Sequence, residues 1–362
     1  MKQLDRKTST RATLSTDWQE MQKRTDWMAA PGMADYVNGM VSAKPLAEGG
    51  HWAIYAREQH VSRLLADRQI STSSINGGLS MMSLACGSGH IEYSLLNQFE
   101  WPISYFLGLE YDDQLRSHAE QSFKNLSQCQ SEFRFFDFNA QNKPVQQFDI
   151  VFCCHSIHHA TDLEGLFPFI NASLKPEGLF IGIDYFGPTR FQIEYDVLPI
   201  IEELFAILPG NLRRNLHDPA QPIEDRFSPP TIQEVRAFDP SESIRSSDLR
   251  TLLFSNFKVV DIKPMGGTLL RWLLQNRAGN FDPEIEEHVA IARLLQFIER
   301  ELIALRKIKS DDLFFVLKKS ERFDQPVSPQ TSVETSGSRF AARSRMRWLH
   351  HLRNLGKRIL KR

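Results

Sequence analysis

Between residues 79 and 185 the chain alternates short apolar runs with longer runs whose apolar side chains recur at helical spacing. A run such as "FDIVFCC" (148–154), apolar on both faces, is typical of a central parallel strand, whereas apolar residues three and four apart predict a helix. The pattern predicts strands at 79–85, 103–110, 132–138, 148–154 and 179–185, and helices at 90–99, 113–126 and 162–174. This alternation with short links predicts an α/β fold with a doubly wound, Rossmann-like parallel sheet.

The flanking segments show a different pattern. Residues 1–75 predict a helical N-terminal extension. Beyond residue 185, helical patterns at about 188–256 and 266–309 interrupt the alternation before strands at 257–265 and 311–320. We therefore expect one domain over 76–320 with two helical insertions that cover a substrate. The composition of 321–338 is that of a linker, and 339–362 form a basic, amphipathic tail.

Charge separates this tail from the rest of the chain. Residues 339–362 hold nine Lys and Arg and no acid, so the other residues carry a net charge of −10 against −1 for the whole chain. Trp348, Leu352, Leu355 and Ile359 fall on one face of a helix, as in helices that lie on anionic membranes. A tail that only improves solubility is the alternative.

The location predicted for the chain is the cytoplasm. No secretory signal and no apolar run of 18 residues occurs, and the four cysteines show neither a disulfide framework nor the spacing of a zinc site. If the tail binds a membrane, we expect a peripheral protein at its inner face.

A glycine turn links the first predicted strand and helix in "LACGSGHIE" (84–92). Gly87 and Gly89 allow a ligand to approach the backbone, and the helix that follows directs its N–H groups toward such a ligand. The dinucleotide pattern G-x-G-x-x-G requires a third glycine where Glu92 stands, so NAD and FAD are not predicted. The lysine of a phosphate-binding P-loop is also missing.

Three further groups of residues follow the strand ends, where α/β sheets bind ligands. Glu110 ends the second strand, where an acid can accept hydrogen bonds from both hydroxyls of a ribose. Asp137 and Phe138 end the third strand, where an acid can accept from an exocyclic amine while an aromatic ring stacks on a purine. Polar residues of "CCHSIHH" (153–159) follow the fourth strand. Each of these residues alone is also compatible with a purely structural role.

In combination, residues 75–187 resemble the class I S-adenosylmethionine-dependent methyltransferases. The turn "LACGSG" corresponds to the first motif of that family, Glu110 to the acid after its second strand, Asp137 to its adenine-side acid and "FDIVFCCHSIHH" to the strand that faces the sulfonium. The resemblance implies S-adenosylmethionine as the cofactor and a cofactor-binding set of Ala85, Cys86, Gly87, Gly89, Glu110, Tyr111, Asp137, Phe138 and His155.

The turn departs from the family at two positions. The acid that usually precedes the glycines falls on Ser83, which cannot supply a charge to the methionine ammonium group, so we expect another residue to do this. The first glycine of the usual run falls on Ala85, which we expect to have a negative φ because an alanine is strained at positive φ.

Three downstream blocks resemble one bacterial subgroup of the family, which accompanies the biosynthesis of surface polysaccharides and other glycans. They are "DYFGPTRFQ" (184–192), "DPSESIRSSDL" (239–249) and "PMGGTLL" (264–270). This resemblance implies O-methylation of a sugar hydroxyl, with Tyr185, Arg190, Glu242 and Arg245 as substrate-binding candidates. An i,i+3 pair between Arg245 and Glu242 is the structural alternative for Arg245, and a natural-product acceptor is the alternative substrate.

Methyl transfer to a hydroxyl requires a group that removes a proton. Because histidine has a pKa near neutrality, His155, His158 and His159 are candidates, and Asp184 at the end of the fifth strand is another. For each, packing or loop capping is the structural alternative. We predict no metal ion, because no carboxylate stands at ligand spacing from these histidines.

Two rival functions remain on the sequence. Nucleic-acid methylation is disfavoured by the acidic body and by "CCHS" at the position of the Asn/Asp-Pro-Pro-aromatic turn of base-amino methyltransferases. A non-catalytic module that binds the cofactor or a partner protein is allowed by Ser83 and Ala85 but disfavoured by the histidine-rich crevice.

Overall fold

The computed structural model describes residues 25–68, 77–140, 143–144, 146–217 and 223–321. The chain divides into two units, Met1–Phe323 and Asp324–Arg362. The second unit lies outside the described residues, and so do the predicted basic tail and its membrane-binding face. Of the helices that the structure describes, none has the length and apolar character that a membrane span requires.

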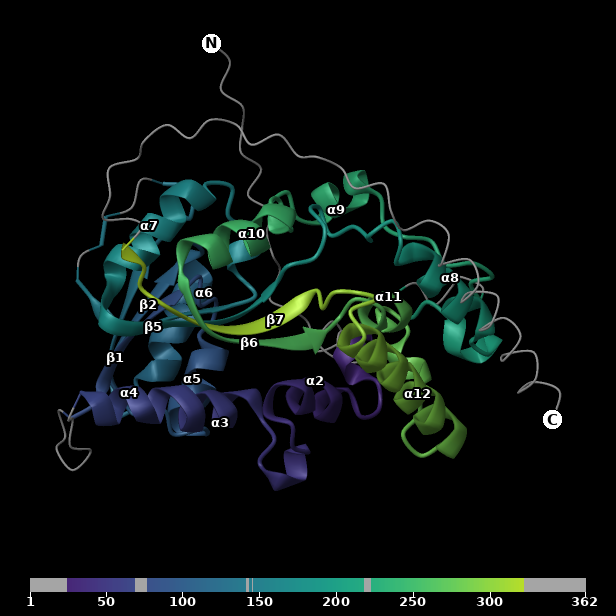
Figure 1. Ribbon diagram of the computed structural model, residues 1–362, viewed down its shortest axis with the longest axis horizontal. Helices are drawn as coiled ribbons and strands as arrows, with labels where there is room; N and C mark the ends of the chain where they lie inside the picture. Colours follow the sequence, from purple (N-terminus) through teal and green to yellow (C-terminus); the bar gives the residue numbers. More distant parts are fainter. Residues whose placement is uncertain (1–24, 69–76, 141–142, 145, 218–222, 322–362) are drawn as a thin grey trace, which may run out of the picture. The chain divides into compact units, whose positions relative to one another are not determined.

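Seven strands form one sheet in the order β3-β2-β1-β4-β5-β7-β6 (Figure 1). The first five strands follow the order of a doubly wound fold. The order in which successive strands are added to the sheet reverses between β1 and β4, which are parallel to each other. The strands are β1 (Leu79–Leu84), β2 (Ile103–Glu110), β3 (Gln130–Phe135), β4 (Phe148–Cys154), β5 (Leu174–Tyr185), β6 (Lys258–Gly266) and β7 (Asp312–Lys318). The α/β, Rossmann-like sheet predicted from the alternation is therefore confirmed.

The sheet differs from the prediction in two details. It is mixed, because β7 runs antiparallel to both β5 and β6, with Asp312 paired to Tyr185 at one end and Lys318 to Leu179 at the other. In addition, β5 begins at Leu174, five residues earlier than predicted, because Leu174 already pairs with Phe148 of β4 across a register shift.

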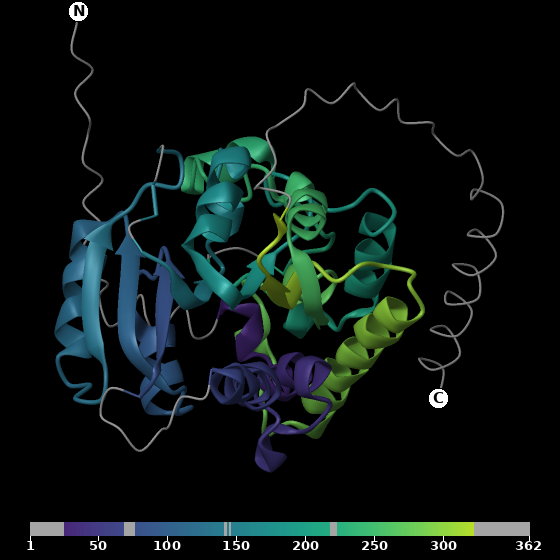
Figure 2. The same ribbon diagram turned by 60° about the vertical axis from the view of Figure 1, so that its left-hand side comes forward.

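Helices cover both faces of the sheet, as Figures 1 and 2 show. Side chains that alternate along each strand enter two separate hydrophobic clusters: Met81 and Phe314 belong to one, Met82 and Phe315 to the other. The first cluster is completed by α5 (His90–Asn97), α6 (Asp113–Phe123), α8 (Leu198–Ile207), α11 (Leu270–Leu274), α12 (Glu286–Ala304) and the N-terminal helices. The second is completed by α7 (Leu163–Ser173) and α10 (Ser246–Asn256).

The described part of the N-terminal segment is helical, as the sequence predicts. It comprises η1 (Trp27–Ala29), α2 (Met33–Ser42), η2 (Leu46–Glu48), α3 (Trp52–Ala56), η3 (Arg57–Val61) and α4 (Ser62–Asp67). Val61 and Leu64 are buried, and the indole N–H of Trp101 donates to the carbonyl of Ala53 at 3.0 Å. These contacts attach the segment to the face of the sheet that carries the first hydrophobic cluster.

The shorter elements lie in the loops that follow the strands. They are η4 (Ile157–His159) after β4, η5 (Gly210–Arg213) and α9 (Ile232–Phe238) between β5 and α10, and η6 (Ala278–Asn280) between α11 and α12. The helices between 198 and 256 and between 270 and 304 lie where the sequence predicts insertions.

Candidate active site

One edge of the sheet gathers most of the predicted site residues. The carboxyl ends of β1, β2, β4 and β5 lead into Ala85, Glu110, His155 and Tyr185. Because β7 is antiparallel, it begins at this edge, where Asp312 pairs with Tyr185. Ligands of doubly wound sheets bind beyond the carboxyl ends of the strands at the switch point, which here lies between β1 and β4. We call this edge the ligand edge.

The glycine turn is built from alternate residues in the left-handed region. Ala85, Gly87 and Gly89 have φ values of 48°, 56° and 72°. The expected negative φ of Ala85 is therefore wrong, and the turn retains its shape at the cost of local strain. A Cβ atom added at Gly87 would meet no atom within 4 Å, whereas one at Gly89 would lie 3.1 Å from Ala119 Cβ. Gly87 thus faces open space, and Gly89 lets α5 and α6 pack closely.

Glu110 connects the glycine turn to the end of β2. One carboxylate oxygen accepts from the N–H of Gly87 at 2.7 Å and the other from the N–H of Asp112 at 2.8 Å. Each oxygen keeps a lone pair for a further donor, such as a ribose hydroxyl. Cys86 is buried between these residues, and its burial raises the pKa of the thiol, so it is a packing residue of the turn rather than a reactive one.

The aromatic residues at the ends of β2 and β3 divide into exposed and packed ones. Tyr111 is 61% exposed, and its ring centroid lies 5.3 Å from that of Phe135. Phe138 instead packs edge-on against Phe136 in the second hydrophobic cluster. Asp137 accepts from the N–H of Asn139 at 2.8 Å, which fixes the loop after β3. Of the predicted aromatic residues, Tyr111 is the one open to a planar ligand.

Glu92 is a site residue that the sequence reasoning missed. It is only 2% exposed, and the hydroxyl of Ser83 donates to its Oε1 at 2.6 Å. Its Oε2 is buried and has no hydrogen-bond partner among the described residues, and burial raises the pKa of the carboxyl to about 7. A buried carboxylate thus lies in contact with residue 83, where the family has its acid, but it comes from the first turn of α5. An unpartnered buried carboxylate oxygen beside the glycine turn fits a cofactor with a positively charged amino group.

His155 follows β4 directly and has an unusual backbone. Its φ is 48°, and its N–H donates to the carbonyl of Ile183 in β5 at 2.8 Å. The side chain is open to solvent and hydrogen-bonds to no described residue. Although part of the residue is exposed, the protein packed around the rest of the ring partly desolvates it and lowers its pKa, which favours the neutral imidazole at pH 7. The residue remains a candidate base or cofactor contact at the ligand edge.

Asp184 holds His158 rather than facing an acceptor. Its fully buried carboxylate accepts from the N–H groups of Ser156 and Ile157, both at 2.9 Å, and from that of Tyr185 at 2.8 Å. It also contacts Nδ1 of His158 at 2.5 Å. Burial lowers the pKa of His158, but the Asp184 carboxylate outweighs it and raises the pKa above its usual value. Because four protein donors occupy both oxygens of this fully buried carboxylate, Asp184 acts in this structure as a positioning residue.

Two further residues, His159 and Glu242, lie beside His158. Nδ1 of His159 lies 2.9 Å from the hydroxyl of Ser241, and the rings of His158 and His159 are 4.2 Å apart. Glu242 Oε1 lies 3.6 Å from Nε2 of His158. A carboxylate that the sequence did not place near the histidines therefore lies beside them.

Arg190 and Arg245 both make protein contacts. Arg190 donates from its backbone N–H to the carbonyl of Ser243 at 2.7 Å and from its guanidinium to that of Pro240 at 2.6 Å. Arg245 donates to both carboxylate oxygens of Glu164, at 2.6 and 2.8 Å, and to Asp248 at 3.0 Å. The predicted alternative of a pair between Arg245 and Glu242 is therefore wrong. The two arginines fix the loop that carries Glu242.

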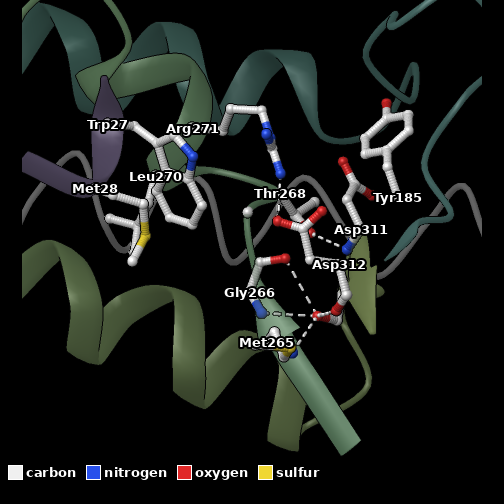
Figure 3. A network of polar contacts seen from close by, with 12 residues as sticks. Trp27, Met28, Tyr185, Met265, Gly266, Thr268, Leu270, Arg271, Asp311 and Asp312 are labelled. Carbon is white, nitrogen blue, oxygen red and sulfur yellow. Dashed lines mark hydrogen bonds and ion pairs between the residues drawn. The ribbon is translucent and has the colours of Figure 1, made fainter. Parts of the chain in front are cut away.

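A second missed group of charges lies where β7 begins (Figure 3). Arg271 forms an ion pair with Asp312, and its guanidinium carbon lies 5.1 Å from the ring of Trp27, 5.6 Å from that of Tyr185 and 5.5 Å from that of Phe191. Arg271 Nε and Asp312 Oδ1 are buried without a hydrogen-bond partner among the described residues.

Asp311 is the neighbour of this ion pair, and its carboxylate lies beside Tyr185 (Figure 3). The backbone of Asp311 is fixed, because its N–H donates to the hydroxyl of Thr268 at 3.0 Å and its carbonyl accepts from Phe186 at 2.6 Å. The side chain is different: no described group donates a hydrogen bond to its carboxylate, although the residue is only 5% exposed. Burial, together with the charge of Asp312, raises the pKa of Asp311 to about 8.

Comparison with known proteins gives a direct match for the segment that carries the glycine turn and the histidines. Residues 82–180 match the family described as "Methyltransferase domain", which is less than a third of the chain. No curated protein matches the chain.

Solved structures are similar at low identity. An S-adenosylmethionine-dependent methyltransferase from Mesorhizobium loti is 15% identical, with 71% of this chain and 95% of that chain covered and a TM-score of 0.35. The YcgJ protein from Bacillus subtilis is 14% identical, with 72% and 99% covered and a TM-score of 0.37. Coclaurine N-methyltransferase bound to N-methylheliamine and S-adenosylhomocysteine is 12% identical, with 75% and 73% covered and a TM-score of 0.41.

The family match carries the assignment, because it spans β1 to β5, the part of the sheet that holds the turn, Glu110 and the histidines. The strand order of a doubly wound fold and the unpartnered carboxylate oxygen of Glu92 agree with it. Residues 82–180, which form most of the ligand edge, are thus similar to the methyltransferase-domain family.

Proposed function

We propose that the chain is an S-adenosylmethionine-dependent methyltransferase that transfers the methyl group to a hydroxyl oxygen of a sugar acceptor. The observation that carries the proposal is the carboxylate of Asp311, which is almost fully buried, hydrogen-bonded to no described group and located at the ligand edge beside Tyr185. At 5% exposure this carboxylate has little contact with water and no protein donor, an arrangement that favours a role toward a ligand. A hydroxyl acceptor supplies the donor that this carboxylate lacks.

The chemistry assigns each group a role. When bound, S-adenosylmethionine would supply the methyl group, and the residues of the ligand edge would hold the acceptor hydroxyl and take up its proton. The acceptor proton passes to a base, which we take to be Asp311, with neutral His155 as the alternative. A raised pKa makes Asp311 a stronger base than an exposed aspartate, near the value that suits proton transfer at neutral to mildly alkaline pH.

The surroundings of Asp311 support a polyhydroxylated acceptor. Tyr185 and Phe191, with ring centroids 5.1 Å apart, both pack against the Arg271 guanidinium and so hold this cation beside Asp311 and Asp312. Arg271 and Asp312 each keep a polar atom that no described group satisfies, and hydroxyl groups can act as donor to one and acceptor to the other. Phe186, by contrast, packs against Phe254 in the second hydrophobic cluster, so we do not include it among the acceptor-binding residues.

The same residues bear on two alternatives to a sugar methyltransferase. A natural-product acceptor with a phenol or alcohol group would use the same base, but it would need fewer polar partners than a sugar. A non-catalytic module has no use for an unpartnered buried carboxylate at the ligand edge, which disfavours it. The basic tail lies outside the described residues, so a peripheral membrane location and a lipid-linked glycan remain predictions from the sequence.

The proposal is tested by an acceptor panel assayed for the mass of the product. The purified protein and S-adenosylmethionine are incubated with nucleotide-linked sugars, lipid-linked sugars, phenols and amines in separate reactions. We expect a gain of one methyl group on a sugar hydroxyl and none on the amines. Transfer to an amine alone, or S-adenosylhomocysteine binding without transfer to any member of the panel, would refute the sugar assignment.

We further propose that Glu92 supplies the charge for the amino group of the methyl donor. Its Oε2 is unpartnered, while Oε1 is held by Ser83. The amino group of the donor is cationic, so a carboxylate here adds a charge-assisted hydrogen bond. Because burial raises the pKa of Glu92 to about 7, a rise in pH through that value increases the ionised fraction and should tighten donor binding.

Glu92→Ser should weaken the binding of S-adenosylhomocysteine roughly 10-fold or more, since a hydrogen bond to a charged group contributes about 1.5–3 kcal/mol. The exchange variant Ser83→Asp/Glu92→Ser returns a carboxylate to the pair and should recover most of the affinity. Isothermal titration calorimetry at pH 8 measures both, with Glu120→Ser, an exposed acid of α6, as the control. Equal affinities for Glu92→Ser and the wild type would exclude this role.

A further inference from the structure

We propose that His158, His159 and Glu242 bind a divalent transition-metal ion beside the ligand edge. One ring nitrogen of each histidine and a carboxylate oxygen of Glu242 lie within 4.8 Å of one another. The three residues come from two segments that are about 80 residues apart in the sequence: η4 after β4, and the loop before α10. The site does not depend on the nature of the acceptor.

The hydrogen bonds of the two rings leave Nε2 as the nitrogen that each offers to a ligand. Nδ1 of His158 lies 2.5 Å from a carboxylate oxygen of Asp184, which can only accept, so Nδ1 carries the proton. The hydroxyl of Ser241 donates to Asp239 at 2.7 Å and therefore accepts from Nδ1 of His159. When these rings bind a metal ion in their neutral form, the lone pair of each is therefore on Nε2. A carboxylate or hydroxyl that holds the opposite ring nitrogen is the usual outer support of a metal-bound histidine.

The third ligand is positioned in the same way. The hydroxyl of Ser243 donates to Oε1 of Glu242 at 2.6 Å, and Arg190 fastens this loop through the carbonyls of Pro240 and Ser243. Among the described residues, Glu242 forms no ion pair with a lysine or arginine, and its partner is His158 at 3.6 Å. The carboxylates of Asp184 and Glu242 on either side of His158 thus meet no basic side chain other than a histidine, which favours a bound cation.

The ligand types indicate which metal to expect. Imidazole nitrogens suit Zn²⁺, Fe²⁺, Co²⁺ and Ni²⁺, whereas Mg²⁺ and Ca²⁺ prefer sites made of oxygen atoms alone. Three protein ligands leave at least one position open, as in catalytic rather than structural zinc sites. The ring of His158 lies 6.2 Å from that of Tyr185, so the open position would serve oxygen atoms of a molecule at the ligand edge.

The test is metal binding by the full chain without an affinity tag, after treatment with a chelator and without methyl donor or acceptor. We expect one Co²⁺ per chain with a visible d–d absorption, displaced by Zn²⁺. Glu242→Gln and His159→Ala should weaken Zn²⁺ binding by more than about 100-fold, and Ser241→Ala, which removes only the support of His159, by roughly 10–100-fold. His118→Ala, an exposed histidine of α6, should bind as the wild type does.

Each result decides the proposal. Absence of the cobalt absorption in the wild type would overturn it and would mean that His158 and Glu242 form an ion pair only. Unchanged affinity in both Glu242→Gln and His159→Ala would also overturn it, because the ion would then bind elsewhere. If circular dichroism shows that His159→Ala does not fold, Glu242→Gln and Ser241→Ala still distinguish metal binding at this site from its absence. Since no acceptor is present, failure of the sugar assignment leaves this test unaffected.

Discussion

Replacing Asp311 by Asn is expected to reduce the rate of methyl transfer about 10²- to 10⁴-fold, the usual contribution of a positioned general base. The variant keeps the shape of the side chain but loses the ability to take a proton. Binding of S-adenosylhomocysteine should stay within about twofold, because the charged groups that act on Asp311 are Asp312, Arg271, Glu299 and Arg250, and Glu110 of the glycine turn is not among them. The measurement is the transfer rate under saturating donor, with calorimetry for the cofactor.

The pH dependence gives a second readout of the same prediction. Because the pKa of Asp311 is raised to about 8, the wild-type rate should rise with pH and level off above that value, where the carboxylate is ionised. The residual rate of Asp311→Asn should lack this rise. Exposed Asp225 is the matched control, and Asp225→Asn should keep both the rate and the pH profile. A wild-type rate that is already at its maximum at pH 6 would point to neutral His155 as the base.

The stability of the protein should depend on pH through Asp311, because its carboxyl group has different pKa values in the folded and unfolded states. The pKa of Asp311 in the folded protein lies above the ordinary value of 3.8, so the folded protein holds a proton that the unfolded chain has lost. The free energy of unfolding therefore falls as the pH rises from about 4 to 8. Asp311→Asn removes this loss, so its melting temperature should exceed that of the wild type at pH 9 and approach it at pH 5.

The sequence predicted the part of the site that follows local rules. Strands that alternate with helices place Gly87, Glu110 and His155 at strand ends, and a doubly wound sheet brings such ends to one edge. Arg271 and Asp311 could not be found by this rule. Asp311 precedes an antiparallel strand, whose beginning rather than end lies at the ligand edge, and Arg271 comes from a short helix after β6. Only the order of the strands in the sheet shows this.

Glu92 and Glu242 illustrate a second reason for the gaps. Glu92 stands in the first turn of a helix, a position that acids commonly occupy on the surface, and only its contact with Ser83 shows that the carboxylate is buried. Glu242 is about 80 residues from the histidines that it faces, and the loop that carries it is fixed by Arg190, whose backbone has a positive φ. Neither the contact of Glu92 with Ser83 nor that of Glu242 with His158 can be predicted from periodicity or local spacing.

Arg271→Met is expected to lower the free energy of unfolding by about 3–5 kcal/mol at pH 8, the usual cost of removing one partner of a buried ion pair. Arg271 is the cation paired with Asp312, and it also lowers the pKa of the neighbouring Asp311. Without it, two buried carboxyl groups lie side by side with no paired cation. For a domain of this size we expect the melting temperature to fall by roughly 10 °C. Differential scanning calorimetry measures the change.

The double variant Arg271→Met/Asp312→Leu separates the ion pair from the packing of the side chain. Replacing both partners by apolar groups removes the unpaired charge, so the double variant should regain more than half of the lost stability. Lowering the pH to 5 should also reduce the loss in the single variant, because protonation neutralises the carboxyl groups that remain. A single variant as stable as the wild type at pH 8 would contradict the buried ion pair. Equal instability of the single and double variants would instead assign the loss to the contacts of Arg271 with Trp27, Tyr185 and Phe191.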